Sequence, residues 1–460
     1  MTQPPTNSTT APAASPPSTQ KPRCRETLAV FTICWVALAG HAAVTGRLAG
    51  PPRNPDGVSY HAIGIGLAEG HGYATAHASP RFRQPYEAAG QSDALPPPGE
   101  PSTTALRPPL LPTVHAVAAR TVGPRFWLLR LLTTACVAAA TAITFRWVAT
   151  AVLCTRNGDV RLAAGLLIAL AVVVDYRTRE MSRTLLTEPL AALFVAAAVD
   201  RLIVLTRTNR LRDGLWVGVW LGLAALTRTA IVLWLPVLAA TWCIVRWTTS
   251  DQTLAGSARA AAVWTGVALL IVSPWIVRNA RLPGRHLLGT QGSLELPAGF
   301  SDAAWDRRGI WDIESRPGFE LAEGFAAESQ QATSNRRIAL DWIQHHPEKA
   351  AVLFPLKVLR ELGPHAHGDV ALWILAALGI AASWPRAAAW VPLLPVVATL
   401  VVVGVTWSVA GRFLWPVAPL MHGLATLGLF HAVVSIRRNR TVTAAGATPP
   451  ANASLDGSRD

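Results

Sequence analysis

Charged side chains at the edges of long apolar runs are the residues of this sequence that could do chemistry. Asp56 begins a short apolar-periodic stretch that includes Tyr60 and ends at Gly70 or Gly72, which indicates a helix with the aspartate at its start. Aspartate at that position is a preferred helix cap. The same carboxylate could instead act as a general base that removes a proton from an acceptor hydroxyl. The spacing alone favours neither interpretation of Asp56.

Glu188 is a second carboxylate in a costly place, because it lies at the start of the apolar segment 185–206, within Thr187-Glu188-Pro189. A carboxylate just inside an apolar helix needs a partner or a function. We therefore expect either a structural ion pair with a neighbouring arginine or a role in a site.

Three arginines, Arg228, Arg278 and Arg412, recur at the ends of apolar runs. Any one of them could simply extend to the polar edge of an apolar layer. Three that converge on the face carrying Asp56 fit an anion site better, since guanidinium groups suit phosphate. Arg278 and Arg412 are the first choices because proline and tryptophan lie close to each in the sequence, and Arg228 is the third.

The composition indicates what kind of element positions these residues. Of 460 residues, 51% are apolar and only 15% are charged, against roughly 25% charged in a typical soluble protein. These values disfavour a soluble globular enzyme, a disordered protein and a coiled coil. The net charge of +14 is scattered between the apolar runs and forms no nucleic-acid-binding stripe. The five cysteines show neither metal-ligand spacing nor a disulfide framework.

The apolar runs predict an all-α polytopic membrane protein with about ten transmembrane helices, within a range of nine to twelve. The candidate spans are 27–46, 127–150, 161–175, 185–206, 213–227, 229–247, 259–277, 370–384, 388–409 and 413–435.

Arginine-rich short loops place both termini in the cytoplasm and leave 47–126 and 278–369 as two large extracytoplasmic segments. Arg177, Arg179 and Arg183 count against this scheme, because it puts them outside. We predict that 349–363 is an interfacial helix with Lys357 and Arg360 on its polar side. The organisation is then a disordered tail 1–22, a polytopic domain 23–440 and a disordered tail 441–460.

The order of several motifs resembles the GT-C superfamily of integral-membrane glycosyltransferases. The similar branch is that of protein mannosyltransferases and the bacterial aminoarabinose transferase. The matching pieces are Asp56 with Tyr60, Gly70-His71-Gly72-Tyr73, Arg107-Pro108-Pro109 through Pro112, Thr187-Glu188-Pro189, Gly222 through Arg228, Pro274-Trp275 through Arg278-Asn279, His346-Pro347, and Arg412-Phe413 with Pro416 and Pro419.

This resemblance implies a polyprenyl-phosphate-linked sugar donor and inverting transfer on the extracytoplasmic face of the cell membrane. The acceptor would be a protein, a lipid or a glycan, and the first-loop aspartate that serves as base corresponds to Asp56. Arg278, Arg412 and Arg228 would then hold the donor phosphate, with Tyr60 and Glu188 binding substrate or supporting the site.

Two departures from the family pattern matter. Gly57 stands where many relatives have a second acidic residue, and Phe413 stands where tyrosine is common. The metal-binding residues of some members cannot be mapped onto this chain, so a divalent metal ion stays an open question with no ligand set assigned.

Two other classes of function compete with a glycosyltransferase, namely a polytopic transporter and a non-catalytic subunit of an envelope complex. Transporters place charges near the middle of the bilayer and show paired halves. The charges here gather at one face and no internal repeat is visible, which favours the enzyme.

Overall fold

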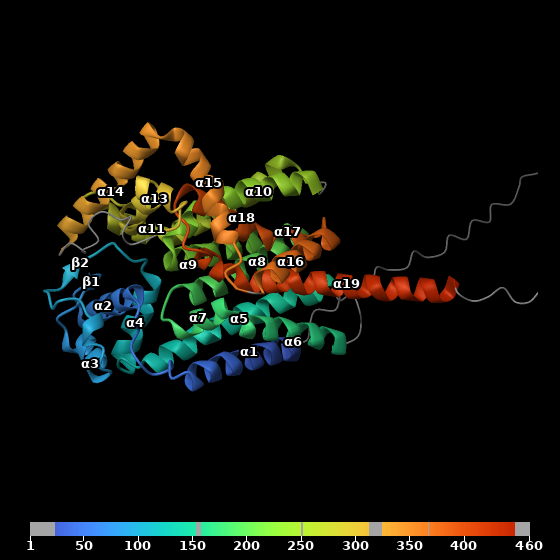
Figure 1. Cartoon of the computed structure of the whole chain (residues 1–460), viewed down its shortest axis with the longest axis horizontal. Helices are drawn as coiled ribbons and strands as arrows, with labels where there is room; N and C mark the ends of the chain where they lie inside the picture. The colour runs from blue at the N-terminus through green and yellow to red at the C-terminus, as the bar shows by residue number, and fades with distance from the viewer. Residues whose placement is uncertain (1–23, 153–157, 250–251, 312–323, 367, 447–460) are drawn as a thin grey trace, which may run out of the picture.

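A computed structural model describes residues 24–152, 158–249, 252–311, 324–366 and 368–446. Long helices run side by side along the molecule, and the only sheet in this part of the chain has two strands of two residues each (Figure 1). The predicted all-α polytopic fold is confirmed. The last helix reaches Gly446, inside the segment predicted as a tail; the rest of that tail and residues 1–22 lie outside the described residues.

Each of the ten predicted spans coincides with one helix or with two consecutive helices. They are α1 (Cys24–Val44), α5 (Phe126–Val152), α6 (Gly158–Val174), α8 (Glu188–Thr208), α9 (Leu211–Thr227), η2 (Thr229–Leu233) with α10 (Trp234–Thr249), α11 (Leu254–Ala280), α16 (Asp369–Ser383), α17 (Ala387–Trp390) with α18 (Leu393–Val405), and η5 (Arg412–Val417) with α19 (Ala418–Gly446).

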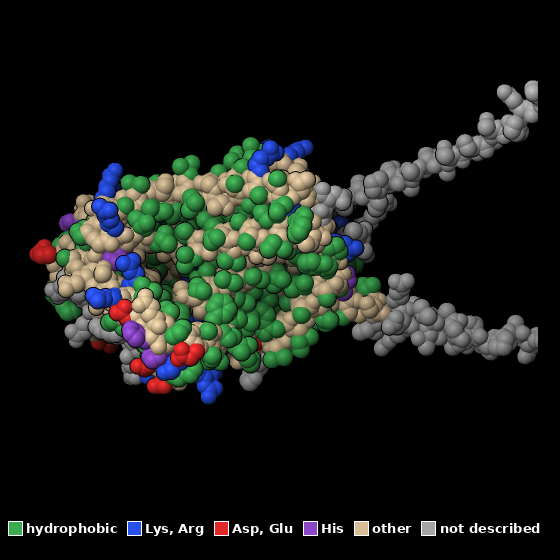
Figure 2. Space-filling model, turned by 90° about the horizontal axis from the view of Figure 1, so that it is seen from above, with side chains coloured by type: hydrophobic (Ala, Val, Ile, Leu, Met, Phe, Trp, Pro, Cys, Tyr) green, Lys and Arg blue, Asp and Glu red, His purple; other side chains and the backbone are tan. Residues whose placement is uncertain are grey.

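Seven of these ten, within the described residues, are long and apolar enough to cross a membrane. The other three, α6, α9 and α16, have 17, 17 and 15 residues, slightly fewer than the roughly 20 that span a bilayer. Hydrophobic side chains cover the middle of the molecule on the face drawn in Figure 2, whereas charged side chains gather toward the end that carries α2 and α14. The chain is therefore a multi-pass membrane protein.

Small residues let the helices of this bundle approach closely. Gly379 of α16 faces the backbone of Leu424 in α19, and Gly428 of α19 faces the backbone of Leu375 in return. A Cβ atom at either glycine would collide with a carbonyl oxygen, so this pair of helices packs backbone against backbone. One large cluster of buried apolar side chains extends through most of the spans and forms the main core.

The two predicted outer segments lie at the same end of the bundle (Figure 1). The first contains α2 (Pro55–Glu69), β1 (Ala74–Thr75), α3 (Pro80–Ala88), η1 (Ser92–Ala94), β2 (Ser102–Thr103) and α4 (Leu110–Thr121). The second contains α12 (Gln291–Glu295), η3 (Leu296–Ala298), α13 (Asp302–Asp306), α14 (Phe325–His345) and α15 (Pro347–Leu362).

Glu328 of α14 joins these two segments. Its carboxylate accepts hydrogen bonds from the Thr104 hydroxyl at 2.7 Å, the Ala105 backbone N–H at 3.0 Å and the Thr290 hydroxyl at 2.5 Å. Hydrogen bonds to a charged acceptor are about twice as strong as neutral ones, so this buried carboxylate fixes the second segment against the first.

Arg177, which the charge rule left unexplained, has buried partners. It lies in α7 (Tyr176–Arg183) and forms ion pairs with Asp369 of α16 and, at 3.7 Å, with Asp175. Asp175 in turn accepts a hydrogen bond from His422 of α19 at 2.9 Å. Arg177 is therefore a buried, paired residue, and its charge carries little information about which side of the membrane it faces.

The expectation that Lys357 lies on a polar surface is wrong. This side chain of α15 has no exposed area, because its face of the helix packs toward α18 and the chain that follows it. The Lys357 ammonium donates a hydrogen bond to the Thr406 carbonyl at 2.8 Å and lies 3.4 Å from the centre of the Phe300 ring. Arg360, in contrast, is exposed as predicted.

Candidate active site

Asp56 is not the cap of its helix. The N-cap of α2 is Asn54, whose side-chain oxygen accepts a hydrogen bond from the Gly57 N–H at 2.6 Å. The Asp56 carboxylate points elsewhere and accepts hydrogen bonds from Arg107 at 2.7 Å and from Arg412 at 2.9 Å. The structure thus removes the capping interpretation, because another residue already does that work.

Arg412 bridges the two carboxylates that the sequence singled out. One terminal nitrogen binds Asp56, and its Nε donates to Glu188 Oε1 at 2.9 Å. Gly411 precedes it with φ +88°, a left-handed conformation that favours glycine. This turn directs the arginine from the start of η5 toward α2 and α8.

Glu188 holds a second arginine with the same oxygen. Arg228, at the junction of α9 and η2, lies 2.9 Å from Glu188 Oε1, and the Glu188 side chain has no exposed area. Its other oxygen is buried with no hydrogen-bond partner in the part of the chain described. The expected ion pair is therefore present, and it positions Arg228 and Arg412 side by side.

The five charged groups sum to one excess positive charge, from three guanidiniums (Arg107, Arg228, Arg412) and two carboxylates (Asp56, Glu188). Burial raises the pKa of Asp56, but the guanidiniums of Arg107 and Arg412 more than offset this and hold that pKa below its usual range. Asp56 is therefore ionised at neutral pH, and with 29% of its side chain exposed it can still be reached.

Aromatic rings support this network from two sides. The Arg107 guanidinium lies 5.3 Å from the centre of the buried Tyr60 ring, and the Arg228 guanidinium lies 5.5 Å from that of Phe413. Both distances are within the range of cation–π attraction. Phe413, noted as a departure from the family pattern, thus gives Arg228 a ring face without a hydroxyl.

The sequence analysis named Arg107 only as part of a proline-rich motif and gave it no role in the site. The signal available was its position directly before Pro108-Pro109. The prolines fix an extended approach to α4, and the Tyr73 hydroxyl donates hydrogen bonds to the Arg107 and Pro108 carbonyls at 2.8 and 3.1 Å. The backbone that carries Arg107 is therefore held rigidly.

Arg278 is not brought together with Asp56. Its guanidinium lies against the rings of Tyr73 and Trp275, 5.1 and 5.0 Å from their centres, and donates to Asn279 Oδ1 at 2.8 Å and to the Tyr73 carbonyl at 3.3 Å. Tyr73 lies between Arg278 and Arg107, because its ring contacts Arg278 and its hydroxyl binds the Arg107 carbonyl. Of the three predicted arginines, Arg228 and Arg412 contact the carboxylates of the cluster. Arg278 contacts Tyr73 instead.

The carboxylates of this cluster do not suit a metal ion. Both oxygens of Asp56 accept hydrogen bonds from guanidinium groups, and one oxygen of Glu188 binds two arginines. Cations so close would repel a divalent metal. In the described residues no group of three or more His, Cys, Asp or Glu side chains is arranged to hold one.

The fold of this chain is similar to that of known membrane proteins. In the described residues, ten helical spans carry two segments folded together at one end, and this arrangement matches two solved structures over most of the chain. No family model and no curated protein matches the sequence, so the likeness is one of fold alone.

Two solved structures represent this likeness. ArnT from Cupriavidus metallidurans bound to undecaprenyl phosphate matches over 93% of this chain and 65% of its own, with 14% identity and a TM-score of 0.51. The oligosaccharyltransferase AglB from Archaeoglobus fulgidus, in complex with an inhibitory peptide and a dolichol-phosphate, matches over 93% and 52%, with 14% identity and a TM-score of 0.52. The chain thus spans about half to two thirds of the length of these neighbours.

Proposed function

We propose that this protein is a glycosyltransferase that moves a sugar from a polyprenyl-phosphate-linked donor to an acceptor hydroxyl, with inversion at the sugar carbon. The observation that carries the proposal is the convergence of Asp56 with Arg107, Arg412, Glu188 and Arg228 in a GT-C fold. The two structural neighbours hold undecaprenyl phosphate and a dolichol-phosphate, which supports the donor class.

In the proposed reaction Asp56 is the base. The acceptor oxygen attacks the anomeric carbon from the face opposite the phosphate, its proton passes to the Asp56 carboxylate, and the bond from carbon to the phosphate oxygen breaks with its electron pair going to the phosphate. The departing lipid phosphate gains negative charge, and fixed cations that bind it more strongly than the intact donor lower the barrier. We assign this role to Arg412 and Arg228, which lie side by side on Glu188.

The same geometry has a consequence for the strength of the base. Two guanidiniums stabilise the Asp56 carboxylate and so make it a weak base in the free protein. A donor phosphate that draws Arg412 away from Asp56 removes one of them, which raises the basicity of the carboxylate. Donor binding would thereby activate the base at the moment a substrate is present.

Arg278 remains a candidate for binding the donor phosphate, after Arg412 and Arg228. It contacts Tyr73, whose hydroxyl binds the Arg107 carbonyl, so it could reach a donor that extends beyond the central cluster.

We also propose that this end of the molecule faces the extracytoplasmic side of the cell membrane. The segments 47–126 and 278–369 are then the outer parts of one domain that covers 23–440. The acceptor in this proposal is a protein, a lipid or a glycan.

The test uses the purified full-length protein with synthetic polyprenyl-phosphate sugars and measures release of polyprenyl phosphate, with and without candidate acceptors. We expect the Asp56→Asn variant to fold and to lose roughly 100- to 10,000-fold in turnover, the usual contribution of a positioned acid–base group. Asp341→Asn, at an exposed position of the same end, is the matched control and should keep its turnover.

Absence of donor cleavage and transfer by the wild-type protein across a panel of hexose and pentose donors would favour a transporter or a non-catalytic subunit. Equal turnover of the Asp56→Asn variant and the wild type would remove Asp56 from the proposed chemistry.

A further inference from the structure

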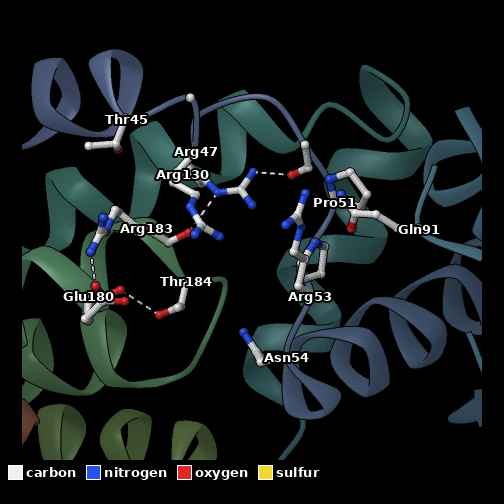
Figure 3. Close-up of a pocket in the computed structure, with 13 residues that line it drawn as sticks. Thr45, Arg47, Pro51, Arg53, Asn54, Gln91, Arg130, Glu180, Arg183 and Thr184 are labelled. Carbon is white, nitrogen blue, oxygen red and sulfur yellow. Dashed lines mark hydrogen bonds and ion pairs between the residues drawn. The ribbon is translucent and has the colours of Figure 1, made fainter. Parts of the chain in front are cut away.

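A second cluster of arginines lines a cavity of about 450 Å³ that the proposed reaction does not use. The cavity lies between the loop that joins α1 to α2, the first turns of α5 and the end of α7. Figure 3 shows Arg47, Arg53 and Arg130 gathered together, with Glu180 and Thr184 on the α7 side. Its volume is within the range of small-molecule binding sites, roughly 300–1,000 Å³.

Arg130 is the buried member of this cluster, with 4% of its surface exposed. Its guanidinium donates to the carbonyls of Leu48 at 3.0 Å, Gly50 at 2.5 Å and Arg183 at 2.9 Å. No carboxylate lies within 4 Å of Arg130 among residues 24–152, 158–249, 252–311, 324–366 and 368–446. It therefore fastens the loop to α7 and brings a full positive charge that nearby acids do not neutralise.

The cavity has a larger positive excess than the cluster around Asp56. Arg47, Arg53, Arg130 and Arg183 face a single acid, Glu180, which forms an ion pair with Arg183. That leaves three excess positive charges here, against one at the Asp56 cluster. The Nε atom of Arg183 is also buried with no hydrogen-bond partner in the described part of the chain.

The cavity also adjoins the proposed active site along two stretches of chain. Asn54, which caps the helix that carries Asp56, lines it, and so does Thr184, four residues before Glu188. Binding in the cavity would therefore occur beside the Asp56 cluster without occupying the arginines of that cluster.

We propose that this arginine pocket is a second anion site, which binds a phosphate group other than the donor's. Several guanidiniums around one space suit phosphate, whose oxygens accept paired, charge-assisted hydrogen bonds. This chemistry is shared by a phospholipid headgroup and by a water-soluble phosphorylated acceptor.

The experiment removes charge from the pocket without touching its structural arginine. Arg47 and Arg53 are both exposed and no side-chain hydrogen bond of either is seen in the described residues, so the double variant Arg47→Ala, Arg53→Ala should fold. The matched control, Arg125→Ala with Arg281→Ala, removes two exposed arginines from the same end outside the pocket. Binding is measured by calorimetry in an uncharged detergent, with dioctanoyl phosphatidic acid in one arm and inorganic phosphate in the other; dioctanoylglycerol is the uncharged reference lipid.

We expect the pocket variant to lose roughly tenfold or more in affinity for phosphatidic acid, with at most a two- to threefold loss in the control. The variant Arg412→Ala should keep this binding, which separates the pocket from the donor phosphate contacts. Inorganic phosphate that binds with the same arginine dependence identifies the phosphate group itself as the ligand; binding of the lipid alone identifies a headgroup site.

Equal affinities of the pocket variant and the control in both arms would overturn the proposal. So would binding that is lost in Arg412→Ala and kept in the pocket variant. Neither result depends on sugar transfer, so failure of the anion-site proposal would not contradict the proposed glycosyltransferase function.

Discussion

Replacing Arg412 tests the proposed phosphate contacts most directly. Its guanidinium makes two charge-assisted hydrogen bonds in a fork, each of 2.9 Å, one to Asp56 and one to Glu188. A hydrogen bond to a charged group contributes about 1.5–3 kcal/mol. If one such bond passes to the departing phosphate, its loss in Arg412→Ala should slow turnover roughly 10- to 150-fold, at about 1.4 kcal/mol per tenfold.

Arg412→Lys should give an intermediate rate. Lysine keeps the positive charge but has no planar fork, so it cannot reproduce both contacts of the guanidinium. We expect Arg412→Lys to recover part of the turnover lost in Arg412→Ala, and less than all of it.

Stability must be separated from catalysis in this experiment. Glu188 has no exposed area, and Arg412→Ala leaves its carboxylate with one fewer cation, although Arg228 still binds it. Removing a partner of a buried charge costs about 1–3 kcal/mol or more. Turnover is therefore expressed per molecule of folded enzyme, counted by monodisperse elution in detergent, and measured as release of polyprenyl phosphate from the donor.

The control is Arg337→Ala, which removes an arginine whose side chain is 84% exposed. Wild-type turnover per folded molecule in both Arg412→Lys and Arg412→Ala, with only the yield of folded protein reduced, would refute the reasoning. Arg412 would then serve to hold helices together at the membrane edge.

Three further predictions concern stability, orientation and pH. Glu188→Gln should lower both the thermal midpoint and turnover, because it takes the charge from the oxygen that holds Arg228 and Arg412; unchanged turnover per folded molecule would confine Glu188 to a structural role. Single cysteines at Ser102 and Ser301, placed in a cysteine-free background, should both react with an impermeant reagent added outside intact cells, and reaction of both only after permeabilisation would invert the proposed orientation. Burial lowers the pKa of Lys357 to about 7, so between about pH 7 and pH 10.5 the unfolded chain binds a proton that the folded chain does not, and stability should rise with pH across that window. Lys357→Met should flatten this rise by at most about 5 kcal/mol, at about 1.4 kcal/mol per pH unit, seen as a smaller gain in thermal midpoint between pH 7 and pH 9.5; parallel pH profiles for the variant and the wild type would contradict the assignment.

The polytopic fold could be predicted from the sequence because a membrane span is a local property. A run of about 20 apolar residues satisfies its own backbone hydrogen bonds as a helix wherever the rest of the chain lies. All ten predicted runs, from 27–46 to 413–435, coincide with helices in the structure. A charge at the edge of an apolar run costs free energy and can be recognised from the sequence alone. For this reason the sequence also indicated Asp56, Glu188, Arg228 and Arg412.

Only the tertiary structure decided what those charges do. Asp56 and Arg412 are 356 positions apart, and no local rule indicates that they meet while Arg278 turns aside to Tyr73. Asn54, and not Asp56, caps α2. The Asp56 carboxylate binds guanidinium groups from distant parts of the chain instead of its own backbone.

The sequence by itself determined the class of element and the chemical types available at one end of the bundle, because both follow from local hydropathy and side-chain chemistry. The structure decided the partners: Arg107 beside Asp56, Lys357 against Phe300, and Arg130 among carbonyls at the base of an arginine pocket. Each of these is set by which helices pack together, and the energy of that packing is spread over many weak apolar contacts that no short motif records.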